Sequence, residues 1–157
     1  MNHPRPPATE RAEVVAALER VAAGLVGITA RAVAEAAPAS DLTLVQWRGL
    51  VVGGSSEGMR IGEIAAQIGS SVPSTSRLVR RLERRGLVTT ERDDADRRAT
   101  IVRSTMAGAA VRVQVIGRRR ELLTEALASL ADPLPKELEP GLEAIATALD
   151  RRAGHLE

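Results

Sequence analysis

The segment between residues 61 and 105 restricts the fold of this chain more than any other part of the sequence. A short apolar helix pattern is followed by a Gly-Ser turn, an arginine-rich helix and two β segments joined by a charged tip. The apolar residues of the short pattern recur at the spacing of one helix face: Ile61, Ile64, Ala65 and Ile68. Gly69 is suited to end that helix. This order of elements predicts a helix-turn-helix followed by a wing, an arrangement typical of DNA-binding proteins.

The arginine-rich helix is predicted to begin after Ser71, a good N-cap, and to continue to Gly86. Pro73 suits its first turn, because a missing N–H costs nothing there. One face is apolar and is expected to be buried: Val72, Thr75, Leu78, Val79 and Leu82. The other face is polar and cationic: Pro73, Ser74, Arg77, Arg80, Arg81 and Arg84. Five arginines oppose the single Glu83, so the helix is strongly positive.

This cationic face suits insertion into a major groove. The residues predicted to reach base edges are Ser74, Thr75, Ser76 and Arg77, and those predicted to contact phosphates are Arg80, Arg81 and Arg84. A charged face that is simply solvated is the alternative interpretation. Solvated faces usually mix both signs of charge at a spacing of four residues, and this face hardly does.

A β hairpin is predicted from residues 87–91 and 100–103, which are rich in β-branched side chains, with a polar tip at residues 92–98. Arginine at such a tip can enter a minor groove, so Arg97 and Arg98 are predicted to contact DNA. Asp96 is predicted to orient an arginine by an ion pair. The acids of the tip, Asp93, Asp94 and Asp96, suggest a metal site as an alternative, which the three arginines in the same seven residues disfavour.

The rest of the sequence is predicted to be helical. A stripe at helical spacing, with Thr9 as cap and Ala37 as the last residue, predicts a long first helix: Val14, Leu18, Val21, Leu25 and Ile28. Thr43 and Gln46 form a capping box for a short second helix that ends at residues 53–54.

Two further helices follow the hairpin. Thr105 is predicted to cap a fifth helix to about residue 131, whose apolar seam includes Arg120 as its polar member: Ala109, Val113, Ile116, Leu123, Leu127 and Leu130. A sixth helix is marked by Leu138, Leu142, Ile145 and Leu149, with Pro140 kinking or restarting it.

These apolar stripes are too long to be covered by the winged segment alone, so they predict an intertwined homodimer; a monomeric helical bundle is the alternative. The predicted fold class is mainly α with a small two- to three-stranded β wing. The expected division is an N-terminal dimerisation helix at residues 1–37, a winged helix-turn-helix at 42–104 and C-terminal dimerisation helices at 105–157.

The chain resembles the MarR family of winged-helix transcriptional regulators. The resemblance is carried by residues 76–88 (SRLVRRLERRGLV), the wing pattern Arg92-x-x-x-Asp96-Arg97-Arg98, Thr105-x-x-Gly108, and residues 42–47 (LTLVQW). It implies a homodimer on a pseudo-palindromic duplex, with recognition helices in major grooves, wings in flanking minor grooves, and release by small ligands, often aromatic acids.

The sequence departs from the family pattern at two positions. Arg60 stands where the family often has Thr or Ser as helix cap, which predicts a helix start weakened by ~1 kcal/mol. Ser104 stands where the family favours Leu. Neither change removes a predicted DNA contact.

Composition excludes several other classes of function. With no Phe, no Tyr and one Trp, the chain lacks the aromatic residues on which single-stranded nucleic acids stack. The absence of Cys and the position of both His residues in the tails disfavour catalysis and a zinc site, and no phosphate-binding loop is present, so we expect no enzyme activity, no metal and no cofactor. No membrane span or signal peptide is expected, and the predicted location is cytoplasmic.

Positive charge is concentrated where DNA contact is predicted. The formal net charge is only +2, yet residues 70–103 hold nine arginines against five acids. Trp47 either lines the ligand pocket of the family or is core packing of the second helix. Arg48 is the second predicted ligand-binding residue, with Arg20, Arg31 and Arg112 as further candidates for a small aromatic or anionic effector; solvated faces are the alternative for each arginine.

The sequence therefore predicts a homodimeric regulator of transcription that binds double-stranded DNA and represses until a small molecule releases it. A dimeric protein-interaction or ligand-binding module without DNA binding is the alternative.

Overall fold

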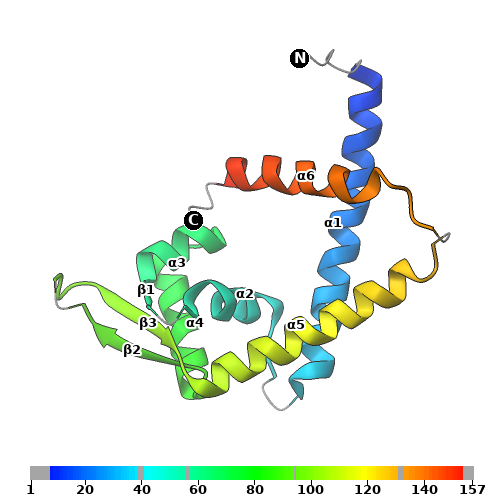
Figure 1. Ribbon diagram of the computed structural model, residues 1–157. Coiled ribbons are helices and arrows are strands. Elements are labelled where there is room, and N and C mark those ends of the chain that lie inside the picture. Colours follow the sequence, from blue (N-terminus) through cyan, green and yellow to red (C-terminus); the bar gives the residue numbers. More distant parts are fainter. Residues whose placement is uncertain (1–7, 39–40, 56, 94, 131–132, 154–157) are drawn as a thin grey trace.

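The computed structural model describes residues 8–38, 41–55, 57–93, 95–130 and 133–153. Within them the chain is mainly helical (Figure 1). The helices are α1 (Ala8–Ala36), α2 (Leu44–Gly53), α3 (Ile61–Ile68), α4 (Val72–Arg84), α5 (Met106–Leu127) and α6 (Leu138–Ala153). The strands are β1 (Met59–Arg60), β2 (Val88–Arg92) and β3 (Thr100–Ser104). In the part of the chain described, none of the helices has the length and apolar character needed to cross a bilayer.

The segment from α2 to β3, which we call the head, is built around one apolar core. Its members come from α2, α3, α4 and the sheet: Leu50, Ile64, Leu78, Val79, Leu82, Leu87, Val88 and Val102. A second core joins α1 and α5 to α2: Ala32, Val33, Ala37, Trp47, Val115 and Leu122. Leu42 and Val111 pack against both cores, so the head and the long helices share a continuous interior.

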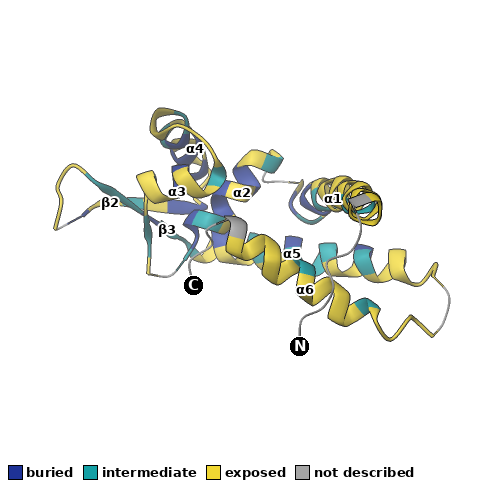
Figure 2. Ribbon diagram, turned by 90° about the horizontal axis from the view of Figure 1, so that it is seen from above, coloured by how far each residue is buried: buried dark blue, intermediate teal, exposed yellow. Residues whose placement is uncertain are grey.

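The sheet is antiparallel, with β3 between β1 and β2. Val88 pairs with Ser104 and Arg92 with Thr100, while Met59 of β1 pairs with Val102 on the other edge. The hairpin agrees with the predicted one to within a residue at each end. The sheet projects from the head on the side opposite α1 (Figures 1 and 2).

The local capping signals of the sequence are confirmed at three helices. Gln46 N–H donates to Thr43 Oγ1 at 3.3 Å and Thr43 N–H donates to Gln46 Oε1 at 3.1 Å, which completes the capping box of α2. Ser71 caps α4, and Thr105 caps α5 by accepting from Gly108 N–H at 3.0 Å. These caps fix where α2, α4 and α5 begin.

Two predicted helix signals are wrong in detail. Thr9 lies inside α1, which includes Ala8, and therefore does not cap it. Pro140 is the third residue of a continuous α6. A proline in the first turn displaces no intrahelical hydrogen bond, so it neither kinks nor restarts the helix.

The apolar faces of the long helices are only partly covered by this chain. α5 packs on α1 through Val115 and Leu122, whereas the predicted seam points elsewhere: Val113 is 72% and Leu127 47% exposed. Apolar residues of α1 and α6 are likewise exposed: Val14, Val15, Val21, Leu142 and Leu149. α6 makes no extensive contact with another described element, and Figure 2 shows the exposed residues along these helices.

Candidate DNA-binding surface and ligand pocket

The ends of α4 are fixed by hydrogen bonds that the sequence provides. Ser71 Oγ accepts from Ser74 N–H at 3.4 Å at the start of the helix. At its end Gly86 adopts a φ of +69°, Gly86 N–H donates to Glu83 O at 2.8 Å and Leu87 N–H donates to Leu82 O at 3.0 Å. This Schellman motif turns the chain directly into β2 and sets the angle between α4 and the wing.

The predicted cationic face of α4 is exposed. Its arginines lie together on the surface: Arg77, Arg80, Arg81 and Arg84. Ser74 is half-buried, and its Oγ accepts from Arg77 Nη2 at 3.0 Å. Ser76 is also half-buried, and its hydroxyl donates to Val72 O at 2.9 Å, which leaves its oxygen lone pairs free to accept.

Thr75 and Val72 differ from the prediction. Thr75 has no exposed surface, so it cannot reach a base edge, and we remove it from the predicted DNA contacts. Its hydroxyl has no hydrogen-bond partner among the described residues. Val72 was expected in the core but is half exposed, because the first residue of α4 has no preceding helical turn to cover it.

The wing tip presents Arg97 and Arg98, both exposed. Asp96 orders the tip in another way than predicted: its Oδ1 accepts from the backbone N–H of Arg98 at 3.0 Å, and the described residues show no ion pair for it. A hollow of about 470 Å³ separates the wing tip from α4, and its lining includes Val72, Ser76, Asp96 and Arg98. Ser76 on α4 and Arg98 at the wing tip thus border the same hollow.

An ion pair at the start of the wing tip was missed by the sequence analysis. Arg60 Nε donates to Asp93 Oδ2 at 2.7 Å, and Asp93 is almost fully buried. The backbone N–H of Ala95, at 2.9 Å from Oδ1, and the Arg60 guanidinium hold the pKa of Asp93 below its usual value. The only signal in the sequence was the unsuitability of Arg60 as a helix cap, which we interpreted as a weakness.

A second contact ties α4 to the wing. Thr90 Oγ1 of β2 donates to Glu83 Oε1 at 2.6 Å. Glu83, the single acid of α4, is thus hydrogen-bonded to the sheet. No group of acids and histidines with the geometry of a metal site occurs in the described residues; Asp94, a member of the predicted alternative metal cluster, lies outside them.

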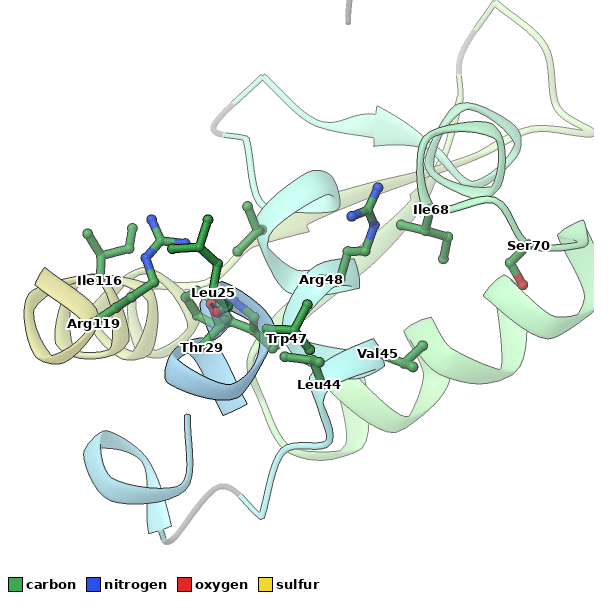
Figure 3. A pocket seen from close by; sticks show the side chains of 12 residues that line it. Leu25, Thr29, Leu44, Val45, Trp47, Arg48, Ile68, Ser70, Ile116 and Arg119 are labelled. Atoms are coloured by element: carbon green, nitrogen blue, oxygen red, sulfur yellow. Dashed lines mark hydrogen bonds between the residues drawn. The ribbon is translucent and has the colours of Figure 1, made fainter. Parts of the chain in front are cut away.

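A pocket of about 480 Å³ lies between the long helices and the head (Figure 3). Its lining is mostly apolar, contributed by α1, α2 and α5: Leu25, Val26, Leu44, Val45, Trp47, Val51 and Ile116. Ile68 and Ser70, at the turn between α3 and α4, form another part of its wall. Trp47 fits both earlier interpretations, because it is 5% exposed in the second core and also lines the pocket.

Two arginines border this pocket. Arg48 Nη2 donates to Gln67 O at 3.0 Å, and Arg119 of α5, which the sequence analysis did not single out, has no hydrogen bond or ion pair to the other described residues. The further arginine candidates lie outside the pocket lining. Arg112 donates to Gly54 O, Arg31 pairs with Glu35 at 2.6 Å, and Arg20 is exposed.

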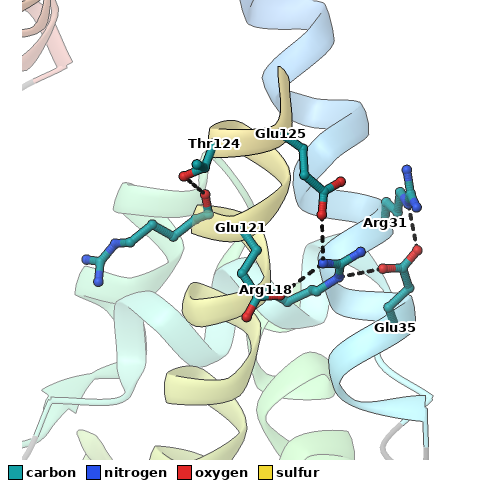
Figure 4. Close-up of polar contacts among 7 residues, drawn as sticks. Arg31, Glu35, Arg118, Glu121, Thr124 and Glu125 are labelled. Carbon is teal, nitrogen blue, oxygen red and sulfur yellow. Dashed lines mark hydrogen bonds and ion pairs between the residues drawn. The ribbon is translucent and has the colours of Figure 1, made fainter. Parts of the chain in front are cut away.

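An ionic cluster stabilises the packing of α5 on α1 beside the pocket (Figure 4). Arg118 Nε donates to Glu35 Oε2 at 2.7 Å, and its Nη1 donates to Glu121 Oε2 at 2.9 Å. These carboxylates raise the pKa of Arg118, with Glu35 the larger cause, and Arg31 and then Arg118 lower the pKa of Glu35. The guanidinium of Arg118 is therefore engaged in ion pairs. Arg119, the next residue, is the cation that lines the pocket.

Comparison with known proteins finds a family match over part of the chain. A sequence model described as the MarR family matches residues 40–99, from just before α2 to just before β3. Over this segment, which holds the helix-turn-helix and the first strand of the wing, the chain is similar to the MarR family. No curated protein sequence matches the chain.

Solved structures share the fold of this chain over most of its length. RV1404 from Mycobacterium tuberculosis is 23% identical, with a TM-score of 0.77 over 98% of this chain and 99% of that one. Sco3205 from Streptomyces coelicolor, a MarR family regulator solved in complex with DNA, is 22% identical, with a TM-score of 0.68 over 95% and 91%. CouR from Rhodococcus jostii RHA1, solved bound to p-coumaroyl-CoA, is 23% identical, with a TM-score of 0.66 over 89% and 91%.

Proposed function

We propose that this protein is a MarR-like transcriptional repressor that binds a pseudo-palindromic DNA operator as a homodimer and is released by a small molecule. The observation that carries the proposal is the exposure of arginines both on α4 and at the wing tip, with Ser76 and Arg98 lining the hollow between the two elements. A helix with exposed arginines beside a hairpin with exposed arginines fits a major groove and the adjacent minor groove of one duplex. Such a protein acts where chromosomal DNA is found, which in a bacterium is the cytoplasm.

Within this surface the residues divide by the contact they make. Ser74, Ser76 and Arg77 lie near the start of α4 and would read base edges, since a recognition helix enters the groove with its N-terminal residues. The phosphate contacts would come from Arg80, Arg81 and Arg84, and the minor-groove contacts from Arg97 and Arg98. Asp96 would support the minor-groove contacts by holding the backbone of the tip.

The homodimer is supported by the uncovered apolar faces of α1, α5 and α6. Val113 and Leu127 on α5 belong to a predicted seam that the described chain covers only in part: Val113 is 72% and Leu127 47% exposed. Two heads must be held about 34 Å apart to enter successive major grooves. A pair of long α5 helices packed through this seam would provide a rigid spacer of that kind.

The pocket beside Trp47 supports the ligand step. An apolar cavity with Arg48 and Arg119 at its edge suits an amphipathic anion, such as an aromatic carboxylate or its thioester. CouR, which shares this fold, was solved with p-coumaroyl-CoA. Because the pocket wall includes α1, α5 and the turn before α4, a ligand there would favour a different placement of the heads and loosen the grip on DNA.

Titration against DNA tests this proposal. Purified protein is titrated with duplex from immediately upstream of its own gene and with a shuffled duplex, at two salt concentrations. We expect tight, salt-sensitive binding that prefers the native duplex. We also expect weaker DNA binding when p-coumaroyl-CoA or a free aromatic acid is added.

Variants then separate the two kinds of contact. Arg98→Ala should weaken binding to both duplexes by roughly 1 to 3 kcal/mol. Arg77→Ala should instead reduce the difference in affinity between the native and the shuffled duplex. If the protein binds neither that duplex nor any member of a random duplex library at low salt, the alternative of an interaction or ligand-binding module replaces the repressor.

A further inference from the structure

Asp93 is a buried acid at the start of the wing tip, the part of the wing that carries Arg97 and Arg98. We propose that Asp93 and Arg60 form a bracket that holds the wing tip at the correct distance from α4, so that this acid increases affinity for a polyanion. The inference rests on the proposed function, because it assigns to Arg97 and Arg98 the contacts that the bracket positions.

The bracket joins two parts of the chain that are 33 residues apart. Asp93 Oδ2 accepts from Arg60 Nε at 2.7 Å and forms an ion pair with Arg60 Nη2 at 2.5 Å, so two guanidinium nitrogens converge on one carboxylate oxygen in a charge-assisted contact. The side chain of Asp93 is only 10% exposed, whereas that of Arg60 is 47% exposed. The carboxylate is therefore the enclosed partner and the guanidinium closes over it.

Each partner is also fixed to its own side of the surface. Arg60 belongs to β1 and directly precedes α3, and its backbone N–H donates to Glu63 Oε2 at 3.0 Å. Asp93 begins the tip: its N–H donates to Ala99 O at 3.1 Å and its Oδ1 accepts from Ala95 N–H at 2.9 Å. The bracket therefore links the tip to the helix-turn-helix at one defined position.

This position matters for the arginines of the tip. Arg60 and Arg98 both line the hollow between α4 and the wing, so the bracket sits in the wall that separates the wing from the reading helix. Without it, the tip would be held by the hairpin ladder and by the Thr90–Glu83 contact farther down β2. An exposed two-stranded tip with fewer restraints samples more positions, and ordering it on DNA then costs entropy.

Electrostatics alone predicts the opposite effect of this acid. Removing a negative charge near a polyphosphate should strengthen binding, because the surface becomes more positive. Asp93→Asn removes the charge and keeps the shape of the side chain. The bracket predicts that the variant binds DNA about tenfold more weakly, at the lower end of what a lost groove contact costs.

A double-mutant cycle tests whether Asp93 acts through the tip arginines. DNA affinity is measured for the full-length protein, Asp93→Asn, Arg97→Ala/Arg98→Ala, and the combination, with duplex selected from a random library and thermal unfolding as a check of the fold. We expect Asp93→Asn to weaken binding in the parent and to have less than about a twofold effect once the tip arginines are gone, since coupled residues are not additive. Arg60→Lys should keep part of the affinity, and Arg60→Gln should resemble Asp93→Asn.

Glu91→Gln is the matched control. It removes one carboxylate from the same wing, at a side chain that is half exposed and pairs with Arg103 at 2.7 Å, and it should leave binding unchanged or slightly tighter. Unchanged or tighter binding by Asp93→Asn would overturn the bracket, and so would an equal loss with and without the tip arginines. By contrast, a parent protein that binds no duplex, or an Arg97→Ala/Arg98→Ala variant with parental affinity, would overturn the proposed function itself.

Discussion

Thr75 places a hydroxyl group in the core of the head, where the described residues offer it no hydrogen-bond partner. Its neighbours on that face of α4 are Leu78, Val79 and Leu82. A buried hydroxyl without a partner loses its hydration and gains nothing in return. Thr75 therefore contributes volume and β-branched shape to the core, while its unpaired hydroxyl oxygen lowers the free energy of unfolding.

This view of Thr75 predicts the effect of Thr75→Val. The substitution replaces the orphan hydroxyl with a methyl group of similar size, so the free energy of unfolding should rise by about 1 kcal/mol. DNA affinity should stay the same, because the side chain is enclosed. Chemical denaturation and DNA titration measure the two quantities.

Thr75→Ala is the control for volume at this position, and it should destabilise the fold because it leaves a cavity. A loss of DNA affinity in Thr75→Val, with the fold intact, would return Thr75 to the set of DNA-contacting residues.

The start of α5 shows how one helix is anchored to the head. Thr105 Oγ1 donates to Gly86 O at 2.6 Å, and Thr105 N–H donates to Leu87 O at 3.1 Å. Gly108 lies so close that a Cβ at this position would be 2.0 Å from Leu87 O. The Thr105-x-x-Gly108 pattern thus caps α5 and lets its first turn rest on the backbone that ends α4.

Gly108→Ala should disrupt this anchor. Alanine usually stabilises a helix relative to glycine by about 1 kcal/mol, but the clash here is with backbone that cannot rotate away. We expect a net loss of about 1 to 3 kcal/mol in unfolding free energy, in the range of other overpacking changes. Thermal or urea unfolding measures it.

Gly62→Ala in α3, where an added Cβ meets nothing within 4 Å, is the control and should not destabilise the protein. If Gly108→Ala had the stability of the parent protein, the backbone between α4 and α5 would be able to shift and accommodate the added Cβ.

Local signals account for the elements that the sequence predicted well. Caps such as Thr43 and Thr105 and the terminator Gly86 act within one turn of the chain, so their effect can be read from neighbouring residues. β1 has two residues and exists only because it pairs with β3, which is a contact that no local pattern encodes.

Long-range contacts explain what the sequence did not predict at the candidate site. The partner of Arg60 lies 33 residues away, and Val72 is half exposed because no helical turn precedes it in α4 to cover it. Helical periodicity gives the direction of a buried face but not which residues at its margin are covered. For α5, helical periodicity predicts an apolar seam, but it does not show that the face with Val115 and Leu122 is the one packed on α1.

At the scale of the whole molecule, the two cores make the head and the long helices mechanically dependent on each other. Leu42 and Val111 contact both cores, and the pocket beside Trp47 opens at the same junction. A ligand that separates α2 from α1 and α5 would therefore change the position of α4 relative to the long helices. This is the kind of discrete rearrangement that a regulator needs between its DNA-bound and released states.

The uncovered seam of α5 predicts how the molecule assembles. Val113 is 72% exposed in the single chain and would be enclosed between two copies. Val113→Arg would then bury two unpaired guanidinium groups per dimer, one from each copy, which opposes association by at least about 3 kcal/mol. That corresponds to a dimer dissociation constant raised by about a hundredfold or more. Sedimentation over a range of protein concentrations measures this constant.

DNA binding should fail together with dimerisation in Val113→Arg, although this residue lies far from α4 and the wing. Two linked heads bind a two-fold site with the advantage of effective concentration, and separate heads do not. Val45→Arg is the matched control: Val45 is a 62% exposed valine on α2, outside α1, α5 and α6, and its replacement should leave the protein dimeric. A Val113→Arg protein that remains dimeric and binds DNA as the parent does would place the dimer contact on another face, and α5 would no longer be the spacer between the heads.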